Sequence, residues 1–235
     1  MDKHFFGLLN DRGYHRFKRR ISRIIAFILL LPIALLFIYR IPLIHPPSTL
    51  MIRDDLFWRD YEHSWRPLSE ISPYLQSAVL LSEDGQFCAH HGVDWHQLRL
   101  ALSKRGGPTR GASTITMQMV KNLYLWHGRS YLRKGLEIPY ALIADALLPS
   151  RRIMEIYLNI AEWGPGVYGA EAAARHYFNR SARNLTPRQA IYLAVALPNP
   201  KIRNPARPSA HLTQLMRSVS RRMSQGASYV ECLKQ

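Results

Sequence analysis

The sequence predicts a mainly α-helical domain that follows one N-terminal transmembrane helix. From Pro67 to the end of the chain, apolar residues recur at helical spacing almost everywhere. No stretch that alternates apolar and polar residues is long enough to predict a strand of useful length. Near the N-terminus, residues 24–39 form an uncharged apolar segment directly after a basic one. These three observations together predict the fold class.

The apolar segment is interpreted as an uncleaved membrane anchor. Its sixteen uncharged residues fall short of the roughly 20 that a membrane-spanning helix needs. We therefore expect the anchor to cover residues 24–44, with Arg23 and Arg40 extending toward the lipid headgroups. A cleavable signal peptide is the alternative, but no small-x-small cleavage site follows. Residues 1–23 hold seven basic and two acidic side chains, which the positive-inside rule keeps in the cytoplasm.

The charge of the chain indicates an anionic partner. The formal net charge is +16 and the sequence pI is about 10.3. Nucleic acid, a membrane surface and a phosphate-bearing substrate are all consistent with such a charge. The anchor places 25 of the 32 basic and 14 of the 16 acidic residues outside the cytoplasm. Nucleic acid is therefore excluded as the natural partner, and membrane phosphates or a phosphorylated lipid are favoured.

The two cysteines, Cys88 and Cys232, leave the redox state open. They are able to pair in an oxidising compartment, but no spacing rule indicates that they do. The sequence has no Cys-x-x-Cys and no His-x-x-x-His pattern. A dedicated metal site with zinc-type ligand spacing is therefore not expected.

The chain divides into a tail, an anchor, a connecting segment and a main domain. Residues 1–23 are the cytoplasmic basic tail and residues 24–44 are the anchor. Residues 45–66 begin with a stiff, non-helical exit that contains Pro46 and Pro47, and they continue without a clear period. Residues 67–235 form the main domain.

Cap residues and breakers predict the helices of the main domain. Ser72 before Pro73 is typical of a helix start, and Asp94 is a good N-cap. Thr186 and Gln189 have the spacing of a capping box. Ser72, Asp94, Ser130, Ser150 and Thr186 are expected to cap helices. Further helices are expected to start at Ser113 and Ala170, and a last amphipathic helix is expected over residues 212–223.

Two further expectations concern the segments between these helices. A basic loop rich in helix breakers is predicted at residues 104–111. In the helix after Ser130, Pro139 cannot donate a hydrogen bond to the Gly135 carbonyl, so a kink is expected beside Glu137. The same helix is expected to direct its apolar residues inward, namely Leu132, Leu136, Ile143 and Leu147.

A first candidate site lies at the C-terminal end of the helix that begins at Pro73. Glu83 and Asp84 stand there, directly before a loop that contains Gly and His. The negative end of the helix dipole and the nearby apolar surface are expected to raise the pKa of these carboxyl groups, so that they exchange protons near neutral pH. The alternative is an ordinary polar helix end.

A second and a third candidate site contain hydroxyls, amides and cations. Helix entry residues Ser113, Thr114, Thr116 and Gln118 precede Lys121 and Asn122, and a helix N-terminus suits an anion or a polar sugar. The alternative there is a well-capped helix with surface threonines.

The third candidate site consists of Arg133, Lys134 and Glu137, which share a helix face. Two cations on one face suit a diphosphate, and the alternative is a surface ion pair. For Glu155 a structural bond to a neighbouring helix is favoured.

Taken together, these segments resemble glycosyltransferase family 51, the peptidoglycan polymerases, and most closely its single-domain membrane-anchored kind. The resemblance covers residues 72–208. The matching motifs are, in order, Glu83, Asp84, Phe87, His90 and Gly92; Gly111, Ser113, Thr114, Ile115, Thr116, Gln118, Lys121 and Asn122; Arg133, Lys134 and Glu137; Ile153, Glu155, Tyr157, Leu158 and Asn159; and Gly169, Ala172, Ala173, Tyr177 and Phe178.

The resemblance implies a lysozyme-like, two-lobed helical domain with a membrane-proximal jaw. It also implies that donor and acceptor are polyprenyl-diphosphate sugars, so that lipid II and the growing glycan strand are the substrates. Glu83 corresponds to the general base, and Glu137 to a second acid near the diphosphate and a candidate ligand for a divalent cation, Mg or Mn. No organic cofactor is implied. The implied substrate-binding residues are Asp84, Phe87, His90, Ser113, Thr114, Thr116, Gln118, Lys121, Asn122, Arg133 and Lys134.

The residues themselves favour transfer over hydrolysis. A glycosidase needs a carboxylic acid to protonate its leaving group, whereas a sugar diphosphate leaves as a stable anion and needs positive charge. Lys121, Arg133 and Lys134 supply this charge close to Glu137. One carboxylate base beside a cationic leaving-group site fits a single displacement with inversion. The alternatives are a lysozyme-like lytic enzyme with Glu83 as the acid, and a non-catalytic module that binds lipid II.

Three positions depart from the family pattern and concern the geometry of the site. Ser150 stands where the family usually has lysine, so Arg151 is a candidate substitute. Met117 replaces a common glutamine, and Pro139 lies in a helix that usually lacks proline.

The resemblance also implies a bacterial inner-membrane location with a periplasmic domain, membrane lipids as contacts, and other cell-wall synthesis proteins as partners. No transpeptidase activity is expected, since no second catalytic domain follows Gln235.

Overall fold

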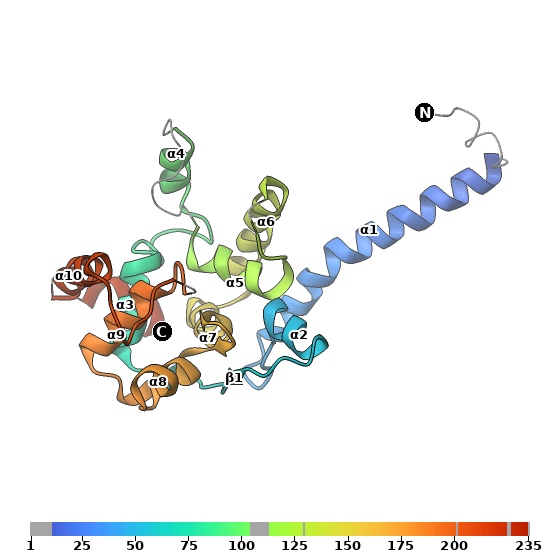
Figure 1. The fold of residues 1–235 in the computed structure, drawn as a ribbon. Coiled ribbons are helices and arrows are strands. Elements are labelled where there is room, and N and C mark those ends of the chain that lie inside the picture. The colour runs from blue at the N-terminus through green and yellow to red at the C-terminus, as the bar shows by residue number, and fades with distance from the viewer. Residues whose placement is uncertain (1–10, 104–112, 129, 201, 225–226, 235) are drawn as a thin grey trace.

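The computed structural model describes residues 11–103, 113–128, 130–200, 202–224 and 227–234. It is mainly α-helical, as predicted, and one long helix projects from the domain (Figure 1). The basic loop predicted at residues 104–111 lies outside the described residues. Within the described residues, the strands are short, two or three residues each.

The projecting helix is α1, Asp11–Tyr39, of which Gly13–Tyr39 is long and apolar enough to cross a membrane. Residues 41–44 do not lengthen the helix, because α1 ends at Tyr39, and the expected anchor bounds 24–44 stay a prediction. Pro42 disfavours a helical backbone at the residue before it, which explains the early end. The helix instead gains its length from the basic segment that precedes the apolar residues.

The exit from the anchor is non-helical over residues 40–48, and a short helix, α2 (Thr49–Leu56), follows in the segment without a clear period. Ser48 is its N-cap and accepts a hydrogen bond from the Met51 backbone N–H at 3.1 Å. Leu50 and Met51 pack against Tyr168, so tertiary contacts hold a helix that is too short to show a period in the sequence.

The remaining helices form the domain in two groups (Figure 1). Helices α3, α9 and α10 pack together on one side, while α5 packs against α6 and α7 on the other, and apolar residues from both groups share one core. The elements are α3 (Pro73–Glu83), α4 (Trp95–Ser103), α5 (Ile115–Tyr124), α6 (Tyr131–Leu147), α7 (Ser150–Ile160), α8 (Ala170–Phe178), α9 (Pro187–Ala196), α10 (Ala210–Ser224) and the 3₁₀ helices η2 (Leu68–Glu70), η3 (Ala182–Asn184) and η4 (Ala227–Leu233).

Two predicted helix starts are wrong, by two residues for α5 and by one residue for α7. Thr114, not Ser113, is the N-cap of α5, because its hydroxyl accepts from the Met117 backbone N–H. The hydroxyl of Ser113 contacts Lys134 instead. For α7 the N-cap is Pro149, and Ser150 is the first helical residue.

The inward face predicted for α6 is wrong at its N-terminal end. Leu132 is 70% exposed, because the first turn of α6 extends beyond the core. The buried residues of this helix are Glu137, Tyr140, Ala141 and Ala144. The helix is continuous through the exposed Pro139, and the kink expected beside Glu137 stays a prediction.

A small three-stranded sheet lies beside α7 and α8. Its order is β1 (Glu62–His63), β3 (Val167–Tyr168), β2 (Glu162–Gly164), with β1 parallel and β2 antiparallel to β3. Gly169 follows β3 with φ of +85°, and a Cβ there would lie 2.7 Å from the Asn159 carbonyl oxygen. Glycine is therefore required where the sheet enters α8.

The structure settles the state of the cysteines that the sequence left open. Cys88 and Cys232 form a disulfide across 144 residues of sequence. It links the loop that follows α3 to η4, which packs against α3 and α7. The C-terminal segment is thereby tied to the loop that carries Phe87 and His90.

Replacing Cys232 by serine is expected to lower the free energy of unfolding of the domain by about 2–5 kcal/mol, because the open chain gains conformational entropy when unfolded. Thermal unfolding of the full chain in detergent measures this change. Wild-type protein treated with a reductant should unfold like the variant, and the variant should not respond to the reductant. Equal midpoints for oxidised and reduced wild type would contradict the expectation.

Candidate active site

Glu83 is the last residue of α3, and its backbone is fixed by the buried side of that helix. Leu75, Val79 and Leu80 anchor α3 in the core, with none of them more than 1% exposed. The carboxylate of Glu83 lies at the edge of this core. It accepts hydrogen bonds from Gln118 Nε2 at 3.1 Å and from the Ser82 hydroxyl at 3.2 Å.

Burial raises the pKa of the Glu83 carboxyl above its ordinary value. The hydrogen bonds from Gln118 and Ser82 and the positive charges of Arg203 and Lys121 oppose this shift without cancelling it. A carboxylate whose pKa lies closer to neutrality is a stronger base. Its position therefore suits proton removal from a bound hydroxyl.

Asp84 has a different environment from its neighbour. Asp84 is 7% exposed. One of its carboxylate oxygens accepts a hydrogen bond from the Ile115 backbone N–H at 2.9 Å, and the other oxygen lies 2.8 Å from His90 Nε2. Burial lowers the pKa of His90, but the Asp84 carboxylate outweighs this effect and raises it above its ordinary value. Asp84 thus holds the start of α5 and the loop, and Phe87 beside it is a core residue with 4% exposure.

Helix α5 separates the predicted binding residues into two sets. Thr114, Thr116 and Asn122 are buried, and the Thr114 hydroxyl donates to the Gly92 carbonyl at 2.6 Å. Gln118 and Lys121 are partly exposed, and so is Ser113 directly before the helix. Only this second set is available to a ligand in this conformation, whereas the buried set supports the helix.

The third predicted group is assembled as a buried charge cluster. Glu137 on α6 is 2% exposed and accepts from the Arg133 guanidinium and from Lys134 Nζ, the latter at 2.9 Å. Lys134 also contacts the Ser113 hydroxyl. The burial of Glu137 contradicts the alternative of a surface ion pair. Its carboxylate orients two cations whose side chains stay 14% and 30% exposed.

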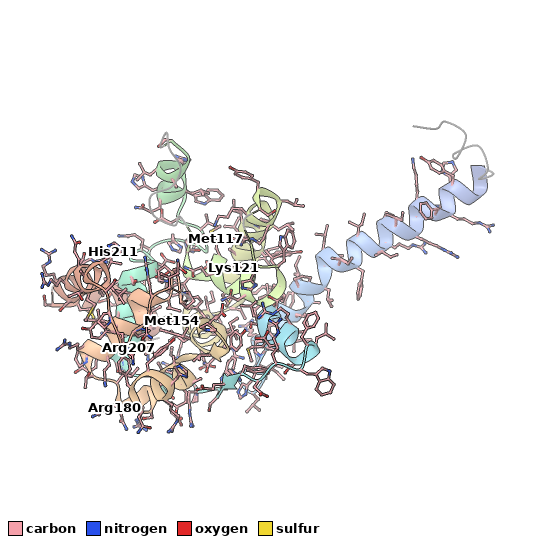
Figure 2. All side chains as sticks on the ribbon, viewed as in Figure 1. Met117, Lys121, Met154, Arg180, Arg207 and His211 are labelled. Carbon is pink, nitrogen blue, oxygen red and sulfur yellow. A yellow bond between two sulfur atoms is a disulfide. The ribbon has the colours of Figure 1, made fainter. Side chains whose placement is uncertain are left out.

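Lys121 is the third cation predicted for the site. It lies near the middle of the molecule (Figure 2), on the helix that also carries Gln118. The pKa of Lys121 is lowered, mainly because the side chain is buried. The negative charges of Glu137 and Glu83 raise this pKa, and the positive charges of Arg133 and Lys134 lower it. Lys121 is therefore within electrostatic reach of both acids. The two predicted groups lie around one helix rather than on opposite sides of the domain.

The donor set around Glu137 does not fit a divalent cation. Both of its carboxylate oxygens already accept from cationic side chains. In the part of the chain that the structure describes, no three His, Cys, Asp or Glu side chains are grouped to hold a metal. No chemical step is therefore assigned to a metal at Glu137.

Two residues near the site were not among the predicted site residues. Tyr157 on α7 donates its hydroxyl to Gln118 Oε1 at 3.1 Å, which directs the amide N–H₂ of Gln118 toward Glu83. The sequence placed Tyr157 in a family motif but assigned it no role in the site. Arg203 contributes positive charge to Glu83 and donates to the Val195 carbonyl at 2.8 Å. It lies in a proline-rich segment without a recognisable motif.

The sequence of the chain is similar to those of known proteins. A family model described as Transglycosylase matches residues 53–224. A protein of Brucella suis biovar 1 (strain 1330), named biosynthetic peptidoglycan transglycosylase, is 58% identical over 214 residues, which cover 90% of this chain and 96% of the relative. Proteins with the same name from Rhizobium johnstonii and Mesorhizobium japonicum are 50% and 48% identical, over 93% and 96% of this chain and 90% and 97% of the relatives.

Proposed function

Since the chain belongs to the transglycosylase family, we propose that it polymerises lipid II into β-1,4 glycan strands with Glu83 as the general base. The protein is a peptidoglycan glycosyltransferase, and lipid II and the growing strand are its substrates. The observation that carries the assignment of roles is the arrangement around α5. Lys121 interacts electrostatically both with Glu83, a carboxylate with a raised pKa, and with the two cations held by Glu137.

The proposed reaction is a single displacement. The acceptor 4-hydroxyl transfers its proton to the Glu83 carboxylate while its oxygen attacks the anomeric carbon of the donor. The bond between that carbon and the diphosphate oxygen breaks with inversion, and the polyprenyl diphosphate leaves with the electron pair. Arg133, Lys134 and Lys121 stabilise the negative charge that develops on the diphosphate.

The same arrangement disfavours Glu137 as the acid of an enzyme that hydrolyses finished glycan. A glycosidase needs a protonated carboxyl at the leaving oxygen. Here the second acid, Glu137, has both oxygens engaged by Arg133 and Lys134, so it has no role as a proton donor in this state. The groups on this side of the site are cations, which suit a diphosphate.

The anchor is a single membrane-spanning helix, α1, and we propose that its basic end is cytoplasmic and the domain periplasmic, at a bacterial inner membrane. The positive-inside rule supports this orientation. The Cys88–Cys232 disulfide supports it as well, because disulfides persist in oxidising compartments. Other cell-wall synthesis proteins stay predicted partners.

The proposed function is tested by incubating the purified full chain with lipid II in detergent and separating the products by length. Long glycan strands are expected. Cleavage of finished peptidoglycan without polymer formation would instead indicate a lytic enzyme. Binding of lipid II without turnover would indicate a binding module.

The rate of polymerisation is expected to depend on pH through Glu83. The carboxylate form is the active base, so kcat/KM should fall as the pH decreases through the pKa of Glu83. Because burial raises this pKa, the acidic limb should lie above the pH at which an ordinary glutamate titrates. A pH series of initial rates measures the limb. An acidic limb at or below the ordinary glutamate value would contradict the expectation.

A further inference from the structure

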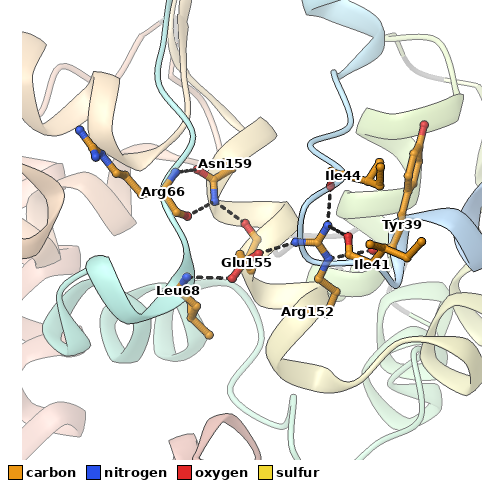
Figure 3. A network of polar contacts seen from close by, with 8 residues as sticks. All are labelled: Tyr39, Ile41, Ile44, Arg66, Leu68, Arg152, Glu155 and Asn159. Atoms are coloured by element: carbon orange, nitrogen blue, oxygen red, sulfur yellow. Dashed lines mark hydrogen bonds and ion pairs between the residues drawn. The ribbon is translucent and has the colours of Figure 1, made fainter.

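The C-terminal end of the anchor helix makes a specific contact with the domain. The last carbonyl groups of a helix lack partners within the helix, and the helix dipole makes this end negative. After Tyr39, the chain turns through residues 40–44 before α2. Carbonyl groups from this end and turn face α7 of the domain (Figure 3).

Arg152 on α7 binds three of these carbonyl groups with one guanidinium. Its Nε donates to the Tyr39 carbonyl at 2.8 Å, and one terminal nitrogen donates to the carbonyls of Ile41, at 3.0 Å, and Ile44. The Arg152 side chain is 7% exposed, and its guanidinium also lies 5.6 Å from the Trp65 ring centre. The planar fork of arginine suits several acceptors at fixed positions, which lysine cannot match.

The remaining side of Arg152 connects to the segment that enters α3. Its other terminal nitrogen donates to Glu155 Oε1, and Glu155 Oε2 accepts the Leu68 backbone N–H at 2.8 Å (Figure 3). Asn159 holds the same segment through both backbone groups of Arg66, each at 2.8 Å. The structural role predicted for Glu155 is therefore observed. Leu68 lies five residues before Pro73, the first residue of the helix that carries Glu83.

A second set of contacts fixes the anchor against α6. Tyr140 donates its hydroxyl to the Leu29 carbonyl within α1 at 3.1 Å, and Leu36 is fully buried. Tyr39 stacks on Tyr124 of α5, with ring centres 6.4 Å apart and ring planes within 5°. The anchor therefore contacts both helices that carry the cationic side of the site.

We propose that Arg152 is a positioning residue that holds the membrane anchor in a fixed orientation relative to the catalytic helices. The path runs from the carbonyls of Tyr39, Ile41 and Ile44 through Arg152 and Glu155 to the entry of α3. The membrane-spanning helix is then a rigid part of the enzyme, and it sets how the site faces the bilayer from which its lipid-linked substrates come. This consequence for turnover rests on the proposed function, whereas the fixed orientation does not.

The orientation is measured with two spin labels on the full chain in bilayer nanodiscs, at cysteines introduced for Ile28 in α1 and Arg180 after α8. Both positions are exposed, and the native cysteines are paired, so the labels attach to the introduced sites. Arg152→Gln should broaden the distance distribution, and Arg152→Lys should broaden it less. The matched control is Arg175→Gln, since Arg175 also pairs with a buried glutamate on its own helix but does not contact the anchor.

Kinetics separate positioning from a general loss of structure. Arg152→Gln should raise KM for lipid II embedded in a bilayer several-fold and leave kcat nearly unchanged. With lipid II dispersed in detergent, where the bilayer imposes no orientation, its KM should match wild type. Equal kcat losses in both media with an unchanged distance distribution would overturn the proposal, as would a variant that equals wild type in every measurement.

A second variant keeps the test valid if Arg152→Gln does not fold. Arg152→Lys keeps a cation beside Glu155 but cannot bond the carbonyls of Tyr39, Ile41 and Ile44 together. This variant should also broaden the distance distribution, and a distribution as narrow as that of wild type would overturn the proposal. If wild type itself makes no polymer, the proposed function fails, and the distance measurement still decides the role of Arg152.

Discussion

Glu83→Gln is expected to reduce glycan polymerisation by about 10²–10⁴-fold, the range that a general base contributes. Glutamine retains the shape of the side chain and its contacts with Gln118 and Ser82, but it cannot accept the proton of the acceptor hydroxyl. Polymer formed from lipid II by equal amounts of wild type and variant measures the loss. Glu70→Gln is the matched control, because Glu70 is a glutamate with 45% side-chain exposure, paired with Arg66.

The loss must not arise from unfolding, and the sign of the pKa shift predicts that it does not. Because the folded-state pKa of Glu83 is raised, its contribution to stability is fully present below the unfolded pKa and is lost as the pH rises through the folded pKa. At pH 8 the ionised glutamate therefore costs stability that glutamine does not. The midpoint temperature of thermal unfolding should be at least as high for Glu83→Gln as for wild type at pH 8, and the difference between the two midpoints should shrink toward pH 4. A variant that polymerises like wild type would remove Glu83 from the mechanism.

Arg133→Ala is expected to lower turnover by about 10²–10³-fold, the loss seen when one preorganised donor to a developing negative charge is removed. Arg133 is held by Glu137 and by its own Nε donation to the Gly128 carbonyl at 3.0 Å, so it has little conformational freedom to lose when the diphosphate binds. Initial rates of polymerisation measure the effect. Arg133→Lys should retain part of the activity, because the charge remains and the planar fork is lost.

Arg188→Ala provides the comparison for this prediction. Arg188 is exposed on α9 and contacts Tyr192, remote from the charge cluster on α6. Both variants remove one positive charge from a strongly basic protein, so general electrostatic attraction to the membrane changes equally. Equal losses for the two variants would contradict the role of Arg133 at the leaving group.

The helices of the main domain were predictable because their signals are local. Thr186 and Gln189 form the predicted capping box, and Ser130 caps α6 as expected. The short helix α2 was not predictable, since its stability comes from Leu50 and Met51 against Tyr168, more than a hundred residues away. Leu132 was placed in the core because spacing alone does not show where a helix extends beyond the domain.

The candidate site was predictable as a set of residues but not as an arrangement. The motifs identified Glu83, Lys121 and Glu137, and the structure places all three around α5. A motif does not show which way each side chain faces, so Phe87 and Thr116 were included although both are buried. Contacts between distant segments, such as Arg152 with the end of the anchor, have no signal in a single sequence.

In the proposed mechanism, Glu83 accepts the proton of the acceptor hydroxyl, and the cations near Glu137 bind the diphosphate. The most direct test is the affinity of polyprenyl diphosphate, the leaving product, for wild type, Glu83→Gln and Arg133→Ala in the same detergent. The proposed mechanism predicts that Glu83→Gln binds the product as tightly as wild type although it makes far less polymer, and that Arg133→Ala binds the product much more weakly. Weakened binding by Glu83→Gln together with unchanged binding by Arg133→Ala would contradict it.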